Sequence, residues 1–273
     1  MSTRNLHSPL VPFAAPPTGE DPALAFQPAE GTGHGPNPGL DYYGACRPAG
    51  GVSGDFFDFI PLDHRWLLAS VGEAPGRGMA SSALMAAVEA HFRGVAIGSP
   101  GALAAAASQL NRALCEIESP GTIATLFCAC IDAWRRTLRY LSAGHEPALL
   151  FRAGRPHIHR LEPTGTVLGL TARTVFRQRT VTLDPGDVLI AYTAGVTDGQ
   201  PGCALGEAGL IEAVEDHRND PPRILVERVL QTAARCGNGA SRPADQTVLA
   251  IRVAGSAGSL NQGRAEALAF AAA

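Results

Sequence analysis

The chain has few charged and few aromatic residues, and neither kind gathers along one segment. Among its 273 residues 17% are charged and 6% are aromatic, and 22 Lys and Arg against 25 Asp and Glu give a net charge of −3. No stripe of Lys and Arg with interleaved aromatic residues occurs, which argues against a nucleic-acid partner. No segment approaches the roughly 20 apolar residues of a transmembrane helix, so we expect no membrane partner.

Cysteine is present but shows no pairing pattern. The six cysteines form no C-x-x-C pair, and their spacing fits no zinc ribbon or finger. Cys128 and Cys130 alternate in a strand-like run, so they share one face and are expected to be buried free thiols. Free thiols predict a reducing, cytoplasmic location.

The distribution of Pro and Gly divides the chain into three parts. Residues 1–37 are rich in Pro, Gly, Ala and Ser without periodicity, which predicts a disordered or loosely packed N-terminal arm. Residues 38–254 have the patterns of a folded domain, and residues 255–273 form a Gly/Ser/Ala-rich C-terminal tail. We therefore expect one large domain between two tails.

Within that domain, strand patterns outnumber helix patterns. Three helices are predicted, over 79–95, from Pro100 to about 115, and over 221–236, and the first would bury a stripe of Leu84, Ala87, Val88, His91 and Val95. Strands are predicted over 40–46, 54–60, 66–72, 122–132, 137–142, 147–151, 174–183, 187–193 and 246–253. Strands in the middle with helices outside predict an α+β fold, an α-β-β-α sandwich of two mainly antiparallel sheets.

Two acidic residues, each preceded by a glycine, flank one predicted hairpin. Asp55 follows Gly54 and Glu73 follows Gly72, with an apolar-rich run between them. A hairpin would bring the two carboxylates to the same end of a sheet, where they would suit a hard cation such as Mg²⁺ or Mn²⁺.

Two other residues are candidates for a role at this site. Arg77 lies between Gly76 and Gly78 before the first helix, where glycines and a helix N-terminus could cradle a phosphate; the alternative is a solvated arginine in a turn. His145 has the right chemistry for a general base. No serine or cysteine nucleophile motif accompanies it, so we expect a structural histidine.

A series of motifs resembles the metal-dependent protein phosphatase (PPM) family, in its bacterial SpoIIE-like branch. They run in family order and span about residues 40–253. They are Gly54-Asp55-Phe56-Phe57-Asp58-Phe59, Gly72-Glu73-Ala74-Pro75-Gly76-Arg77-Gly78, Ser142-Ala143-Gly144-His145-Glu146-Pro147, Asp184-Pro185-Gly186-Asp187, Tyr192-Thr193-Ala194-Gly195-Val196-Thr197-Asp198 and Ala244-Asp245-Gln246-Thr247. The resemblance implies the same α-β-β-α sandwich and a site for two Mn²⁺ or Mg²⁺ ions.

The resemblance also identifies where this chain departs from the family. The family places aspartates at four metal positions, which here hold Asp55, Glu73, Ala194 and Ala244. Asp55 and Glu73 are thus the expected catalytic and metal-binding residues. Ala74 and Asp245 complete the expected metal-site residues, and Arg77 is the expected phosphate contact.

Three functions follow as alternatives. The first is two-metal hydrolysis of a phosphoserine or phosphothreonine protein in bacterial signalling, impaired by the two alanines; the resemblance implies a phosphorylated regulatory protein, such as an anti-sigma-factor antagonist, as substrate. The second is a pseudophosphatase that binds such a partner without turnover, because one Asp and one Glu poorly neutralise two dications. The third is a structural or sensor-coupled module that forms a homodimer.

Overall fold

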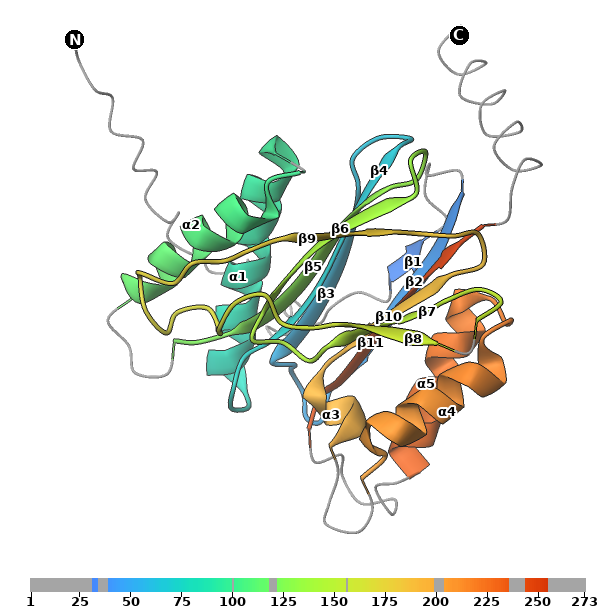
Figure 1. Ribbon diagram of the computed structural model, residues 1–273. Helices are drawn as coiled ribbons and strands as arrows, with labels where there is room; N and C mark the ends of the chain where they lie inside the picture. The colour runs from blue at the N-terminus through green and yellow to red at the C-terminus, as the bar shows by residue number, and fades with distance from the viewer. Residues whose placement is uncertain are drawn as a thin grey trace, which may run out of the picture.

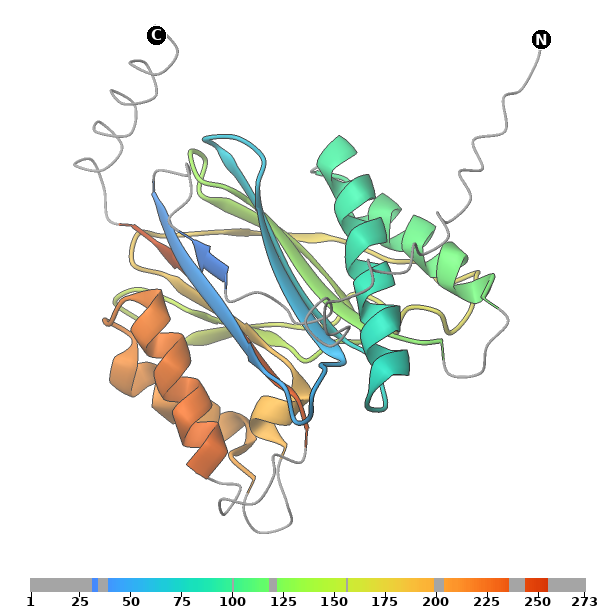
Figure 2. The same ribbon diagram turned by 180° about the vertical axis from the view of Figure 1, so that it is seen from behind.

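The strands form two stacked sheets with helices on both outer faces. A computed structural model describes residues 31–33, 39–99, 101–117, 122–155, 157–198, 204–235 and 244–254. Figure 1 shows α1 and α2 on one outer face of the sheet pair and α4 and α5 on the other. The view from behind shows the same four layers (Figure 2). The predicted α-β-β-α sandwich is confirmed.

The first sheet has the strand order β1-β2-β11-β10-β7-β8, and all neighbours are antiparallel. Its strands are β1 (Gly31–Gly33), β2 (Leu40–Arg47), β7 (Ala148–Phe151), β8 (Ile158–Leu161), β10 (Val188–Tyr192) and β11 (Gln246–Val253). β10 and β11 lie in the middle of this sheet, so every residue of β10 is buried. This arrangement places the end of β10 beside the start of β11.

The second sheet has the order β3-β4-β5-β6-β9 and is also antiparallel throughout. Its strands are β3 (Asp55–Pro61), β4 (Trp66–Glu73), β5 (Thr125–Asp132), β6 (Thr137–Ala143) and β9 (Arg179–Thr182). β3 and β4 form the predicted hairpin, with Asp55 directly opposite Glu73. One end of this sheet therefore carries the acid pair and the other carries the hairpin turns.

Five helices flank the sheets in the described part of the chain. They are α1 (Met79–Gly98), α2 (Leu103–Cys115), α3 (Ala194–Thr197), α4 (Gly206–His217) and α5 (Pro222–Arg235). α1 and α2 contact strands of the second sheet, and α5 contacts β2 and β11 of the first. Within the described ranges, none of these helices combines the length and apolar character that a bilayer crossing requires.

Three apolar layers hold the sandwich together. The central layer fills the space between the sheets and includes Phe57, Val71, Phe127, Leu150 and Leu249. The two outer layers lie between each sheet and its helices. Alternate residues of the central strands thus enter different layers, whereas the edge strands β8 and β9 are largely exposed.

Cys128 and Cys130 lie on the helix-covered face of β5. Both are free thiols with no exposed surface, as expected from their alternation. Burial raises the pKa of both thiols, that of Cys130 to about 12. Neither is therefore a thiolate near neutral pH.

The structure corrects several expected elements. Gly31–Gly33 was expected within the disordered arm but pairs with β2; the rest of the arm and the tail 255–273 lie outside the described residues. The strand expected over 174–183 is limited to Arg179–Thr182, because Gln178 instead hydrogen-bonds the backbone of Gly101 and Ala104 at the start of α2. The sequence patterns did not predict α3, α4 or β8.

The buried stripe of the first helix is also corrected. Val88 is buried as expected, but the fully buried apolar side chains on its face are Met85, Phe92 and Ala96. Ala87, by contrast, is exposed. The larger Met and Phe side chains decide which face packs on the sheet, which rotates the stripe by about one residue position.

The turn into β10 is stabilised by a buried carboxylate. Asp187 has no exposed surface, and it accepts the backbone N–H of Ala153 at 2.8 Å and that of Asp184 at 2.8 Å. Arg152 lies 3.1 Å from the same carboxylate. Between them, Gly186 adopts a φ of +87°, which only glycine adopts readily.

Replacing this carboxylate should strongly destabilise the protein. We expect Asp187→Ala to lower the free energy of unfolding by about 3 kcal/mol, because two backbone N–H groups lose their acceptor and Arg152 loses one of its two carboxylate partners. Asp184→Ala is the matched control: its half-exposed carboxylate contacts Arg152 alone, so we expect a loss below about 1 kcal/mol. Urea denaturation of both variants measures the difference, and equal losses would contradict this account of the turn.

Candidate functional site

The acid pair lies where three strands of the second sheet end together. Asp55 begins β3, Glu73 ends β4 and Thr125 begins β5, and the register places them side by side across the sheet. Opposed residues of an antiparallel pair point to the same face. These three side chains therefore emerge together, toward the end of β10 and the start of β11 in the facing sheet.

Asp55 is held by two threonine hydroxyls from the other sheet. Its Oδ2 accepts hydrogen bonds from Oγ1 of Thr193 at 2.7 Å and Oγ1 of Thr247 at 2.8 Å. The two threonines are themselves linked, because the Thr247 N–H donates to the Thr193 hydroxyl at 3.0 Å. Ser53 contributes a hydrogen bond from the Asp55 backbone N–H to its hydroxyl oxygen. The carboxylate thus joins the two sheets.

Burial dominates the electrostatics of Asp55. With only 6% of its surface exposed, desolvation raises its pKa to about 7. The hydrogen bonds from Thr193 and Thr247 oppose this rise, and the nearby charges of Glu73 and Asp245 add to it. The negative charge at this position is therefore weakly supported by the residues around it.

Glu73 uses its longer side chain to reach the backbone of α3. Its Oε2 accepts the N–H of Ala194 at 3.3 Å, and its Oε1 lies 3.5 Å from the Thr125 hydroxyl. Burial raises the pKa of Glu73; the Ala194 hydrogen bond opposes the rise, and the charges of Glu146 and Asp198 reinforce it. The acid is thus anchored to a peptide group at one of the alanine positions.

His145 extends this network into the interior. Its Nδ1 lies 2.7 Å from the Thr125 hydroxyl, and only 2% of its surface is exposed. The Thr125 hydroxyl thus lies between the His145 ring and the Glu73 carboxylate. Burial lowers the pKa of His145 to about 4, so the ring is neutral over the physiological range. The predicted structural role agrees with this position.

Both carboxylate oxygens of Asp245 accept hydrogen bonds from a neighbouring loop. Oδ1 accepts the N–H of Ala49 at 2.6 Å, and Oδ2 accepts the N–H of Gly54 at 2.6 Å. The Gly54 carbonyl in turn accepts the N–H of Ala74 at 2.9 Å. Asp245 therefore fixes the loop that leads into Asp55, while Ala74 has only its backbone carbonyl to offer an ion.

The two alanine positions lie on neighbouring segments. Ala194 begins α3 after β10, and Ala244 precedes β11. Between them the backbones approach so closely that a Cβ on Gly195 would lie 1.9 Å from the Asp245 carbonyl oxygen and 3.0 Å from the Ala244 Cβ. Only glycine fits there. The segments that contain Ala194 and Ala244 thus lie next to the acid pair, but the two alanines themselves have no side-chain oxygen.

Arg77 lies on an exposed loop before α1. Gly76 and Gly78 on either side adopt φ values of +97° and +85°. Within the described residues, Arg77 forms no hydrogen bond or ion pair with Asp55 or Glu73. Its expected phosphate contact stays a prediction.

Sequence reasoning did not identify the threonines of the site. Thr125, Thr193 and Thr247 each donate to an acid, yet none was a candidate. Thr193 and Thr247 lie within the motifs that contain the alanine positions, which is a signal that could have found them. The pairing of β10 with β11 is what makes both point at the same carboxylate.

Sequence comparison relates most of the chain to one family. Residues 63–254 match the family model described as Stage II sporulation protein E (SpoIIE). Protein IcfG of Synechocystis sp. (strain ATCC 27184 / PCC 6803 / Kazusa) is 27% identical over 180 residues, which cover 56% of this chain and 28% of IcfG. The phosphoserine phosphatase RsbU of Bacillus subtilis (strain 168) is 24% identical over 195 residues, covering 70% of this chain and 56% of RsbU. The chain thus spans only part of the length of both relatives.

Solved structures share the fold. The PP2C phosphatase domain of the cell fate determinant SpoIIE from Bacillus subtilis, solved with a fragment of its regulatory domain, superposes with a TM-score of 0.69 at 17% identity and covers 78% of this chain and 63% of that chain. The catalytic domain of the serine threonine protein phosphatase PstP, described in complex with two manganese ions, gives 0.56 at 17% identity and covers 79% and 100%. At this identity the likeness concerns the fold alone.

The residues of this chain do not fit a two-metal centre. Dications of this kind need several oxygen ligands each, with carboxylates to balance their charge. Here Asp55 accepts two hydroxyl donors, Asp245 accepts two backbone donors, and Ala194 and Ala244 have no side-chain oxygen. Across the described ranges, no three His, Cys, Asp or Glu side chains lie close enough to hold one ion.

The buried histidine should make stability depend on pH. Below pH 6.5 the unfolded chain gains a proton on His145, whereas the folded chain stays neutral until about pH 4. The folded state binds fewer protons in this window, so His145 should remove about 2 kcal/mol of stability between pH 7.5 and pH 5. Urea denaturation at both pH values should show a smaller acid-side loss for His145→Asn than for the parent chain. His159→Asn, on the exposed face of β8, controls for the removal of a histidine; unchanged pH dependence in His145→Asn would refute the assignment.

Proposed function

This chain belongs to the SpoIIE family and contains its PPM-type phosphatase domain, and from that premise we propose that it is a regulatory binding module that has lost efficient two-metal hydrolysis. We assign this domain to residues 38–254, with β1 (Gly31–Gly33) of the preceding segment paired to its first sheet. The proposed ligand is a regulatory protein phosphorylated on serine or threonine. It would dock at the end of the sandwich that carries the acid pair.

This proposal is supported by the hydrogen bonds that the carboxylates of the site already accept from the protein itself. Oδ2 of Asp55 and both carboxylate oxygens of Asp245 accept hydrogen bonds from protein hydroxyl or N–H groups, and Glu73 accepts the Ala194 N–H at one of the alanine positions. These contacts stabilise the site through the chain's own hydrogen bonds. A buried carboxylate that already has donors gains less from a cation than a bare one does.

The class of partner is proposed from the similarity to RsbU. RsbU is described as a phosphoserine phosphatase, which supports a phosphorylated protein as the ligand class. An anti-sigma-factor antagonist is the proposed example. Arg77, exposed between two glycines at the start of α1, is the proposed contact for the phosphate, since its guanidinium can bind phosphate oxygens in pairs.

A slow hydrolase is the second candidate function. Asp55 and Glu73 remain directly opposed at the end of the β3–β4 hairpin, so two carboxylates of the family site persist on one face. A single Mn²⁺ or Mg²⁺ at this pair would then be weakly held. Metal titration separates the two candidates.

Restoring the missing acids should restore metal binding. We expect calorimetric titration of the parent chain with Mn²⁺ to detect no tight pair of sites. Ala194→Asp combined with Ala244→Asp and Glu73→Asp should bind Mn²⁺ at least about tenfold more tightly, because each added carboxylate supplies a hard oxygen and a negative charge. Hydrolysis of p-nitrophenyl phosphate should rise with it. Adding Asp55→Ala to the triple variant is the control and should abolish the gain.

Activity of the parent chain decides the proposal. Robust Mn²⁺-dependent hydrolysis by the unmodified chain, lost in Asp55→Ala, would overturn the binding-module proposal and support the hydrolase. Binding of a phosphoserine peptide, measured against its unphosphorylated counterpart, tests the ligand class separately. Equal affinity for the two peptides would contradict phosphate recognition.

A further inference from the structure

The end of the second sheet opposite the acid pair carries a cluster of tryptophan and arginine. Trp66 begins β4, Asp132 ends β5 and Thr137 begins β6, and the register places these three side by side. β4 runs from Trp66 to Glu73, so about 24 Å of strand separates this cluster from the acid pair. Both tryptophans of the chain, Trp66 and Trp134, belong to the cluster.

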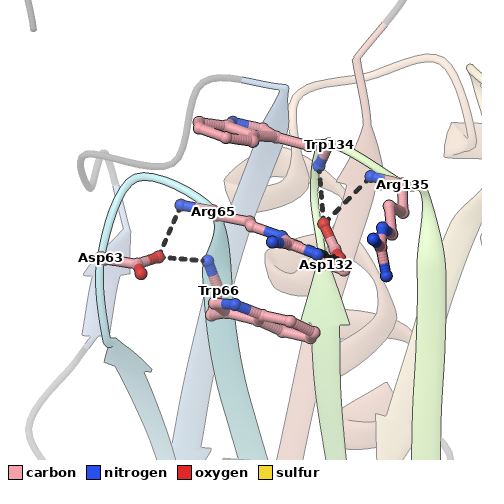
Figure 3. A network of polar contacts seen from close by, with 6 residues as sticks. All are labelled: Asp63, Arg65, Trp66, Asp132, Trp134 and Arg135. Carbon is pink, nitrogen blue, oxygen red and sulfur yellow. Dashed lines mark hydrogen bonds and ion pairs between the residues drawn. The ribbon is translucent and has the colours of Figure 1, made fainter.

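Arg65 is the fixed centre of this cluster. Its guanidinium lies 4.8 Å from the ring centre of Trp66 and 5.9 Å from that of Trp134, and Figure 3 shows it between the two rings. Nε and Nη2 both donate to Oδ2 of Asp132, at 2.9 and 2.5 Å. Arg65 and its stacked rings therefore form a rigid platform.

Both carboxylate oxygens of Asp132 accept hydrogen bonds from within the protein. Its second oxygen, Oδ1, accepts the backbone N–H groups of Trp134 at 3.1 Å and Arg135 at 3.0 Å, which shapes the turn between β5 and β6. The side chain is almost completely buried. Arg65 lowers the pKa of Asp132 despite the opposing effect of burial. This carboxylate consequently neutralises Arg65 and no other arginine of the cluster.

Beside Asp132 lies a cavity whose arginines have no acidic partner. It measures about 260 Å³ and is lined by Trp66, Gly101, Asp132, Arg135, Thr137 and Arg139. In the described part of the chain, neither Arg135 nor Arg139 forms an ion pair. Figure 3 shows the Arg135 side chain next to Asp132, with no contact drawn from its guanidinium.

Gly101 leaves room for one of these arginines. A Cβ at Gly101 would lie 2.6 Å from Nη1 of Arg139, so this glycine lets the guanidinium lie against the corner between α1 and α2. Arg139 is half-buried and Arg135 is exposed. Arg135, in the turn between β5 and β6, and Arg139, on β6, thus border one small cavity.

The whole surface has an excess of positive charge and an exposed aromatic ring. Arg65, Arg135, Arg136 and Arg139 lie at this end of the sheet together with Asp63 and Asp132, and Asp63 accepts the backbone N–H groups of Arg65 and Trp66. The Trp134 ring is 62% exposed. Exposed Trp beside Arg is the composition that dominates binding energy in protein interfaces. The positive charge favours a partner of opposite sign.

We propose that this surface docks an acidic segment of a partner protein. A carboxylate of that segment enters the cavity between Arg135 and Arg139, where two guanidinium forks meet it. A neighbouring apolar side chain packs on the exposed Trp134 ring. The site is separate from the acid pair and does not depend on the function proposed there, so a partner could be held at this end while the other end is free.

The two tryptophans provide a direct measurement. The probe is an acetylated and amidated peptide of sequence Glu-Glu-Leu-Glu-Glu, titrated into the full chain at low salt and followed by tryptophan fluorescence. We expect a saturable change, because no tryptophan lies outside this cluster, and weaker binding as salt is added. The matching Gln-Gln-Leu-Gln-Gln peptide should give no saturable change.

Variants test which residues bind the peptide. Arg135→Glu with Arg139→Glu should weaken binding at least about tenfold, because two attractive charges become repulsive. Arg223→Glu with Arg228→Glu, on α5 in the opposite helix layer, makes the same charge change and should leave the affinity unchanged. Trp134→Ala should also weaken binding, reported then by Trp66 alone. Circular dichroism checks each fold, and the milder Arg135→Gln with Arg139→Gln replaces the reversal variant where that one is misfolded.

Four outcomes would overturn the proposal. They are the absence of saturation with the acidic peptide, equal binding of the glutamine peptide, equal weakening by the α5 control, and unchanged affinity in the Arg135 and Arg139 variants. A separate titration with inorganic phosphate alone distinguishes the source of the anion. Saturation by phosphate at lower concentration than by the peptide would make this a small-anion site and refute docking of a protein segment.

Discussion

The hydrogen bonds of Asp55 to Thr193 and Thr247 hold the two sheets in register at the end that carries the site. They connect the first residue of β3 in one sheet with the end of β10 and the start of β11 in the other. The layer between the sheets is otherwise built mainly from apolar side chains, which fill space without fixing direction. These directional contacts therefore decide how the acid pair and the α3 segment lie relative to each other. Asp245 supports the same junction by fixing the loop before Asp55.

The same contacts explain how the fold tolerates the loss of two family acids. Removing carboxylates from a dense acidic site reduces repulsion among those that remain. Besides burial, the charges of Glu73 and Asp245 raise the pKa of Asp55, and those of Glu146 and Asp198 raise the pKa of Glu73. Hydrogen bonds from the chain itself oppose the rise at both acids. Serine, threonine and backbone groups thereby stabilise an end of the sandwich that would otherwise hold unpaired charge.

Much of the architecture could be predicted because it depends on patterns local to the chain. The sequence shows alternating strands, a hairpin between two Gly-acid motifs and glycines after helices. These patterns predict the sandwich and the pairing of Asp55 with Glu73. The threonine contacts could not be read, because they depend on which strands of different sheets face each other across 138 and 192 residues of sequence. The prediction of the buried face of α1 was partly wrong for a similar reason. The sheet beneath the helix buries Met85 and Phe92, whereas the sequence periodicity fitted the neighbouring set of Leu84, Ala87 and His91 equally well. Asp245 was expected among the metal-site residues. Its hydrogen bonds to the N–H groups of Ala49 and Gly54 could not be predicted, because the strand pattern does not show which loop lies beside it.

The two thiols in the middle of β5 have a consequence for studying motion in this protein. Cys128 and Cys130 lie between β4 and β6, sealed under α1 and α2, so a reagent reaches them only after that helical layer or the sheet itself separates. Their rate of alkylation therefore reports the frequency of large openings, as amide exchange does for buried N–H groups. β5 begins beside Glu73 and ends at Asp132, which binds Arg65. The alkylation rate of these thiols would therefore fall if a ligand at either end of β5 made opening of the sheet less frequent.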